Sequence, residues 1–162
     1  MTTLNQSPIV QTDMLIRRPV GEVFEAFINP EITSKFWFTR SSGQLEAGKT
    51  VEWEWEMYSV SATVEVKEVE KNKRILLEWG EADNRTTVEW VFTSRGDKET
   101  FVSIINKGFK GDEESLVDQA IDAMGGFTMV LCALKALLEH GVMLNVVEDK
   151  APDSNVKDWQ GR

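Results

Sequence analysis

Hydrophobic and polar residues alternate with a period of two along the middle of the chain, between Thr50 and Ile105. Such alternation is typical of β-strands that bury one face and expose the other. Short polar turns separate five of these segments, so we expect an antiparallel meander rather than a parallel sheet. The residues assigned to the buried face are Val51, Trp53, Trp55, Met57, Val60, Ala62, Val64, Val66, Ile75, Leu77, Trp79, Val88, Trp90, Phe92, Phe101, Ser103 and Ile105.

The pattern changes to a helical period between Asp112 and His140. Apolar residues recur there at steps of three and four, which predicts one long amphipathic helix with Asp112 as its N-cap and Gly141 as its stop. Gly125 and Gly126 interrupt this helix, where each glycine costs about 1 kcal/mol relative to alanine. We expect them to permit a close approach of the helix backbone to the sheet. The alternative is that the missing side chains leave cavity space.

The N-terminal part of the chain has the pattern of one strand followed by two short helices. Residues 9–17 are typical of an edge strand, a helix is predicted from Pro19, and a second one from Asn29 to about Phe36. Residues 39–49 form a loop or a loose strand in this prediction. We expect residues 1–8 to be a flexible N-terminus, 9–147 to be a single domain, and 148–162 to be a polar tail.

The apolar faces of the predicted strands need a cover, and the long C-terminal helix is the only predicted element large enough to supply it. We therefore predict an α+β protein with a helix-grip fold. About six antiparallel strands would form a curved sheet wrapped around the long helix, with the two short helices after the first strand. A gap between helix and sheet would form an apolar pocket.

Aromatic and methionine side chains on the predicted inner face are the candidates for lining this pocket. Large rings are hard to pack without gaps and can stack a flat or apolar ligand, although any one of them could equally fill the core. The candidate lining residues are Trp53, Trp55, Met57, Trp79, Trp90, Phe92, Ile105, Ala123, Met124, Phe127 and Leu131. The polar side chains predicted near the pocket mouth are Arg40, Tyr58 and Asn106.

Composition and charge narrow the classes of partner. The 162 residues are 41% hydrophobic and 28% charged, which is typical of one folded domain. The formal net charge of -9 disfavours nucleic acid and anionic membrane surfaces, so we expect neither as a partner. Neither a run of 18 apolar residues nor a signal peptide is readable, and we expect a cytoplasmic protein.

Only one cysteine and one histidine are present, which limits the available chemistry. Cys132 has no partner for an internal disulfide and is expected to pack as a small hydrophobe. His140 falls in the last turn of the long helix, where a protonated imidazole favours the helix dipole. A histidine-rich zinc site is impossible with one histidine. We therefore predict no metal, no cofactor and no catalytic residue.

Several short strings resemble a known family. They are Pro19-Val-Gly-Glu-Val-Phe-Glu-Ala-Phe, Asn29-Pro-Glu, Phe36-Trp-Phe, Gly108-Phe, and Gly126-Phe127 followed by Leu134-Lys135-Ala-Leu-Leu-Glu. Over roughly residues 9 to 141 the chain resembles the START-like (SRPBCC, or Bet v 1-like) superfamily. Its branch resembles the C-terminal domain of the activator of heat-shock protein 90 ATPase, with Phe127 where that branch typically has tryptophan.

Three functions are compatible with these observations. The first, which we favour, is a non-enzymatic protein that holds a small apolar, lipid-like or aromatic ligand between sheet and helix. The second follows from the resemblance alone and is a co-chaperone or interaction module, which leaves a homodimer or a chaperone as partner. The third is an enzyme similar to polyketide cyclases or aromatases, for which one histidine at a helix end makes an acid–base pair hard to assemble.

Overall fold

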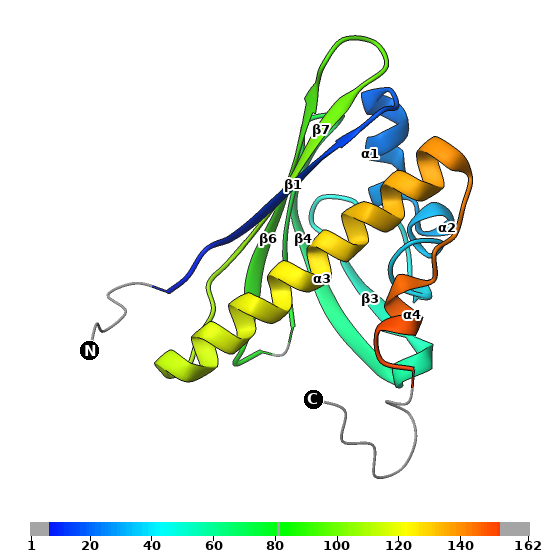
Figure 1. Ribbon diagram of the computed structural model, residues 1–162. Helices are drawn as coiled ribbons and strands as arrows, with labels where there is room; N and C mark the ends of the chain where they lie inside the picture. Colours follow the sequence, from blue (N-terminus) through cyan, green and yellow to red (C-terminus); the bar gives the residue numbers. More distant parts are fainter. Residues whose placement is uncertain (1–6, 81, 153–162) are drawn as a thin grey trace.

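The computed structural model describes residues 7–80 and 82–152 and confirms the α+β helix-grip prediction. All strands belong to one curved antiparallel sheet in the order β1-β7-β6-β5-β4-β3-β2, and the long helix α3 lies across it (Figure 1). The elements are β1 Val10–Ile16, α1 Val20–Ile28, α2 Pro30–Thr33, β2 Arg40–Ser41, β3 Thr50–Trp55, the 3-10 turn η1 Glu56–Tyr58, β4 Val60–Glu70, β5 Arg74–Trp79, β6 Thr86–Ser94, β7 Thr100–Lys107, α3 Glu113–His140 and α4 Val146–Lys150.

Local capping signals place three helix ends, the starts of α2 and α3 and the end of α3, where the sequence predicts them. The Asn29 side chain accepts a hydrogen bond of 3.0 Å from the Glu31 backbone N–H at the start of α2. Asp112 accepts one of 2.8 Å from the Ser115 N–H at the start of α3. Gly141 ends α3 in the left-handed conformation, with φ of +66°. The second short helix is briefer than predicted and ends at Thr33.

The phase of the last strand differs from the prediction. On β7 the buried side chains belong to Thr100, Val102, Ile104 and Asn106, so the predicted inward residue Ile105 lies on the opposite, half-exposed face. The strand carries apolar residues at both odd and even positions, so a period of two alone does not say which set faces the core. Pairing with β1 and β6 decides it, as β7 lies between them.

The strand predicted from Thr50 to Met57 ends two residues early. Trp55 is the last residue of β3, and the chain then turns through η1 into Ser59, which has a φ of +52°. Met57 therefore sits on a turn rather than on the inner face of a strand. Val60, the next predicted inward residue, is 52% exposed.

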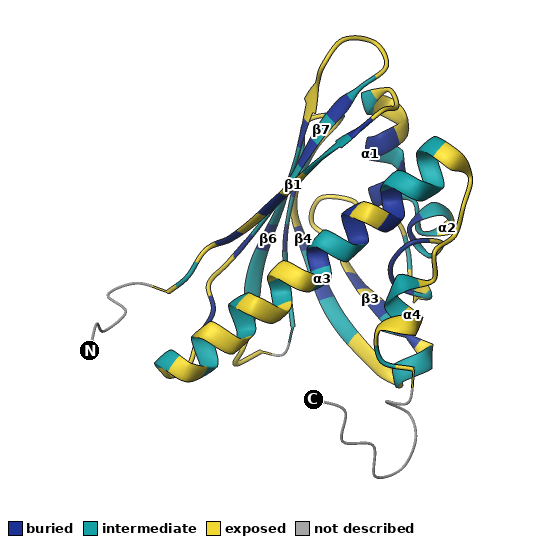
Figure 2. Ribbon diagram, in the orientation of Figure 1, coloured by how far each residue is buried: buried dark blue, intermediate teal, exposed yellow. Residues whose placement is uncertain are grey.

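Burial along α3 is uneven, as Figure 2 shows. Its buried residues are confined to the second half and are Phe127, Val130, Leu131, Ala133 and Leu134. In the first half the apolar residues Val117, Ile121 and Met124 are exposed. Cys132 is also exposed, contrary to the prediction, because it lies on the solvent side of the helix, about 100° around the axis from Leu131.

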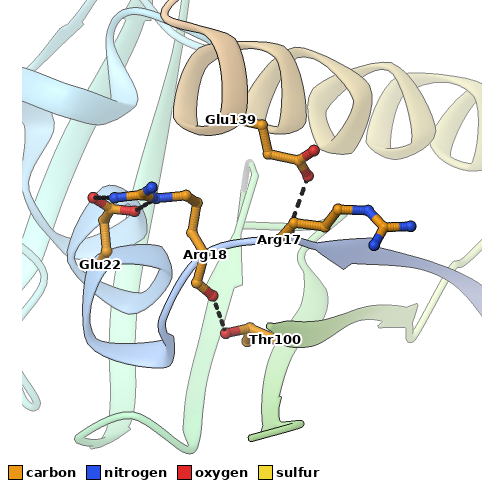
Figure 3. A network of polar contacts seen from close by, with 5 residues as sticks. All are labelled: Arg17, Arg18, Glu22, Thr100 and Glu139. Carbon is orange, nitrogen blue, oxygen red and sulfur yellow. Dashed lines mark hydrogen bonds and ion pairs between the residues drawn. The ribbon is translucent and has the colours of Figure 1, made fainter. Parts of the chain in front are cut away.

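The C-terminal half of α3 is tied to the edge strand β1 by polar contacts (Figure 3). The Glu139 carboxylate accepts a hydrogen bond of 2.9 Å from the backbone N–H of Arg17. Lys135 donates to the Leu15 carbonyl at 2.8 Å and to Glu139 at 2.6 Å. Thr100 Oγ1, on β7, donates at 2.9 Å to the carbonyl of Arg18, which lies just beyond the end of β1. These bonds satisfy backbone groups where β1 ends and the chain turns into α1.

A short helix, α4, replaces the first part of the predicted polar tail. Residues 146–150 are helical, and Val146 and Val147 pack against the core. The Tyr58 hydroxyl donates to the carbonyl of Val147 and, at 3.1 Å, to that of Glu148. Residues 153–162 of the predicted tail and 1–6 of the predicted N-terminus lie outside the described residues.

Candidate ligand pocket

A cavity of about 320 Å³ lies between α3 and one end of the sheet. This is near the lower end of the range of about 300–1,000 Å³ that is typical of small-molecule sites. Its lining residues are Trp37, Trp79, Thr86, Asn106, Phe109, Gln119, Asp122, Ala123, Gly126, Phe127, Met129, Val130 and Val147.

Four of the predicted site residues line this cavity. Trp79 and Phe127 form walls from the sheet and the helix, with ring centroids 5.9 Å apart. Ala123 lies one helical turn before Phe127, and Asn106 comes from the buried face of β7. The sequence therefore identifies members of both walls.

The remaining predicted tryptophans fill the core instead of lining the cavity. Trp53 and Trp90 are nearly parallel, at an interplanar angle of 10° and a centroid distance of 6.1 Å. Trp55 contacts Trp53 edge-on at 6.5 Å. Phe92 and Leu131 are buried as well. These side chains belong to the hydrophobic core, where large rings bury much apolar surface.

The other predicted residues lie away from the cavity. Met124 is 41% exposed on the outer side of α3, and Ile105 is on the outer face of the sheet. Met57 borders a smaller depression of about 200 Å³ beside α4. Arg40 is exposed, lies 3.8 Å from the Glu56 carboxylate and is not among the residues that line the cavity. Tyr58 binds α4, whose Val147 is part of the lining.

Trp37 is the most important lining residue that the sequence reasoning missed. Its ring centroid lies 4.8 Å from that of Trp53, 5.8 Å from Trp79 and 5.9 Å from Phe127. The turn before it is anchored by Thr33, whose Oγ1 donates to the buried Ala26 carbonyl at 2.6 Å. The string Phe36-Trp-Phe was visible as a family motif, but its position beside the pocket depends on the fold of α2.

The paired glycines of α3 correct the expectation of close packing. A Cβ placed on Gly125 or Gly126 would meet no atom within 4 Å, apart from the helix's own nearby backbone. The helix backbone is therefore not pressed against the sheet at this point. Gly126 lines the cavity, so the alternative interpretation, that a missing side chain leaves cavity space, agrees with the structure.

One end of the cavity is polar and tightly hydrogen bonded. Asn106, on β7, donates through Nδ2 to the Thr87 carbonyl at 2.9 Å and to Thr86 Oγ1 at 3.0 Å. Trp79, opposite Thr86 in the strand pairing, donates through its indole Nε1 to the same Oγ1 at 3.1 Å. The ends of β5, β6 and β7 thus bring one amide, one hydroxyl and one indole N–H together.

From α3, Gln119 and Asp122 contribute polar side chains to the lining. Gln119 is held in place because its Nε2 donates to the Lys110 carbonyl and to Ser115 Oγ, each at 2.9 Å. In the described part of the chain, no group of three or more His, Cys, Asp or Glu side chains could hold a metal ion. The arrangement is therefore an apolar container with a small polar end.

Comparison with known proteins places the chain in a family. The sequence profile of the family described as "Activator of Hsp90 ATPase homolog 1-like protein" matches residues 17–139. The chain belongs to this family. Membership confirms the resemblance inferred from the short motifs. By length and composition alone α3 could cross a membrane, and in this fold the second half of α3 is buried in the core.

Solved structures share the fold over most of the chain. A protein from Staphylococcus saprophyticus is 31% identical, with a TM-score of 0.73, over 85% of this chain and 96% of that one. A protein from the dynemicin biosynthetic locus is 18% identical, with a TM-score of 0.70, over 83% of this chain and 48% of that one. An Aha1 dimer from Colwellia psychrerythraea is 15% identical, with a TM-score of 0.69, over 83% and 98% respectively. No curated protein matches the chain.

Proposed function

We propose that this protein binds a small apolar molecule in the cavity between α3 and the sheet. The observation that carries the proposal is the cavity of about 320 Å³ bounded by Trp37, Trp79 and Phe127 and left open by Gly126. Aromatic walls with a few convergent polar groups are typical of small-molecule sites.

The reducing environment of the cytoplasm suits a chain whose single cysteine is free, and we propose that location.

We propose no catalytic role for the polar side chains of this cavity. The polar side chains of the lining are those of Thr86, Asn106, Gln119 and Asp122, with the tryptophan N–H groups. The Asn106 amide and the Thr86 hydroxyl bond to each other and to neighbouring groups of the sheet, and neither ionises near neutral pH. A nucleophile activated by an adjacent base, which covalent catalysis needs, is not formed by these groups.

A pair of variants on adjacent glycines tests the binding site. Gly126→Leu places a side chain in the cavity, whereas Gly125→Leu adds the same side chain outside its lining. Native mass spectrometry of the purified protein, and a thermal-shift screen with neutral lipids and aromatic polyketides, should show binding by the wild type and Gly125→Leu and loss in Gly126→Leu. Equal binding by both variants would place the ligand elsewhere, and absence of any binding by the wild type would refute the proposal.

We propose secondly that the chain self-associates through the first half of α3. Val117, Ile121 and Met124 recur at steps of four and three on one exposed helix face, and Ile121 is 67% exposed. A stripe of this kind is typical of helix–helix contacts. The occupant we infer is a second copy of the chain, in line with the solved dimer that shares its fold.

The oligomeric state tests this second proposal. Light scattering coupled to size-exclusion chromatography should show a dimer that Ile121→Glu dissociates. Val60→Glu, on an apolar residue exposed elsewhere at 52%, should leave it intact. A wild-type chain that stays monomeric at high concentration would exclude the dimer. Stimulation of heat-shock protein 90 ATPase that Ile121→Glu abolishes would instead assign the stripe to a chaperone.

A further inference from the structure

The hydrogen bonds at the polar end of the cavity fix which atoms remain for a ligand. The Thr87 carbonyl only accepts, so the nitrogen of the Asn106 amide must face it, 2.9 Å away. The second Nδ2 hydrogen goes to Thr86 Oγ1. Asn106 is 98% buried (2% exposed), so this orientation is locked. Its carbonyl Oδ1 is the acceptor that remains.

The Thr86 hydroxyl is fixed by the same reasoning. Its oxygen accepts from both Trp79 Nε1 at 3.1 Å and Asn106 Nδ2 at 3.0 Å. A hydroxyl has two acceptor lone pairs and one hydrogen. Both lone pairs are used, so its hydrogen is directed away from these partners, and Thr86 lines the cavity. The polar end therefore offers one donor, the Thr86 O–H, next to one acceptor, Asn106 Oδ1.

The charge of the lining excludes an anionic ligand group. No lysine or arginine is among the residues that line the cavity in the described part of the chain, whereas Asp122 is. A carboxylate or phosphate bound here would find no lysine or arginine among the described lining residues, and an ion without a counterion is costly at low polarity. A donor beside an acceptor instead suits a neutral group that can both accept and donate.

We infer that the cavity selects an apolar ligand carrying a neutral hydroxyl group, an alcohol or a phenol, rather than a fatty acid or a bare hydrocarbon. The hydroxyl oxygen accepts from Thr86, and its hydrogen is donated to Asn106 Oδ1. This inference rests on the proposed function, because it specifies the ligand class of the same cavity. A bound hydrocarbon would leave these two polar groups without hydrogen-bond partners. The resulting loss of affinity is what favours the hydroxyl-bearing ligand.

Four probes with one ring system separate the contributions. Naphthalene has no polar group, 2-methoxynaphthalene only accepts, 2-naphthol accepts and donates, and 2-naphthoate is an anion. Titration calorimetry, checked by quenching of the fluorescence of lining Trp37 and Trp79, gives each dissociation constant. We expect 2-naphthol to bind about tenfold more tightly than naphthalene, 2-methoxynaphthalene to lie between them, and 2-naphthoate to bind most weakly.

Three variants assign the preference to Thr86. Thr86→Val removes the hydroxyl and should reduce the preference for 2-naphthol over naphthalene about tenfold, to near unity, whereas Thr86→Ser should retain it. Thr128→Val is the control, because the Thr128 hydroxyl bonds to Thr12 Oγ1 at 2.8 Å, outside the lining. Circular dichroism confirms that each variant is folded.

The outcomes distinguish this inference from the proposed function. Similar affinity for all four probes, or tightest binding of 2-naphthoate, would overturn the hydroxyl selection while leaving ligand binding in place. A preference for 2-naphthol that survives in Thr86→Val would overturn the assignment to Thr86. Absence of binding of every probe to the wild type would count against the cavity as a ligand site, and so against both.

Discussion

The carboxylate of Glu139, in the last turn of α3, accepts a hydrogen bond of 2.9 Å from the backbone N–H of Arg17, just beyond the end of β1. The two residues are 122 positions apart in the chain, so the bond joins the long helix α3 to the end of the first strand (Figure 3). Burial raises the pKa of Glu139, but the Arg17 N–H and the Lys135 ammonium outweigh that effect, and the pKa lies below its ordinary value.

Removing this carboxylate should destabilise the fold. Glu139→Ala leaves the Arg17 N–H without its acceptor and the Lys135 ammonium with the Leu15 carbonyl alone. We expect a loss of about 1.5–3 kcal/mol, as for other hydrogen bonds to charged groups. Glu22→Ala is the control, because Glu22 pairs with Arg18 on the exposed surface at the start of α1, and it should cost clearly less than Glu139→Ala. Urea unfolding measures both. Equal losses would show that the contact with Arg17 contributes nothing particular.

A second prediction concerns acid stability. Hydrogen bonds from Lys67, at 2.8 Å, and Arg85, at 2.7 Å, lower the pKa of Glu65 to about 2 on the outer face of the sheet. In the unfolded chain the pKa of a glutamate is about 4.3. The pKa is lower in the folded state, so the stabilisation is complete above the unfolded value and disappears as the pH falls toward about 2.

Melting temperatures measured between pH 6 and pH 2 test this effect. The melting temperature of Glu65→Gln should fall less steeply than that of the wild type below about pH 4.3. Glu54→Gln, the same change on the adjacent strand β3, controls for the loss of one negative charge from the sheet. Parallel curves for the wild type and Glu65→Gln would show that the two ion pairs do not stabilise the folded state.

Local and long-range signals explain how far the sequence could predict this structure. The ends of α3 were predictable because Asp112 and Gly141 act through bonds to their own neighbours. The phase of β7 was not, because Phe101 and Ile105 are as apolar as Val102 and Ile104 on the other face. Register with β1 and β6 decides between them, and that is a long-range property.

The same distinction applies to the candidate site. Trp53 and Trp79 both alternate inward in the sequence, yet only Trp79 lines the cavity. Their rings lie 6.0 Å apart and Trp37 contacts both, so the difference is that Trp79 also borders the space beside Gly126. Neither position is encoded in the strands that carry Trp53 and Trp79. The existence of an aromatic interior was therefore predictable from the pattern, whereas the place of the void within it was not.

Tyr58 provides a third prediction, about the mobility of α4. Its hydroxyl donates to the carbonyls of Val147 and Glu148, and Val147 is part of the cavity lining. Tyr58→Phe keeps the ring but removes these bonds, which should increase local opening of residues 146–150 about fivefold, for a loss of about 1 kcal/mol. Hydrogen exchange followed by mass spectrometry measures it, with peptides from the second half of α3 as the internal control. Unchanged exchange in α4 would mean that apolar packing alone holds it.

The last prediction concerns Gly125 within α3 and Gly141 at its C-terminal end. Substitution by alanine should change the free energy of unfolding in opposite directions at these two positions. A Cβ on Gly125 would meet nothing within 4 Å, so Gly125→Ala should raise the free energy of unfolding by about 0.5–1 kcal/mol through helix propensity. Gly141 has a φ of +66°, which alanine adopts only with strain, and Gly141→Ala should lower that free energy by about 1 kcal/mol. Denaturant unfolding measures both changes. A loss of stability in Gly125→Ala would support the close packing that the sequence predicts and would argue against open space at this turn of the helix.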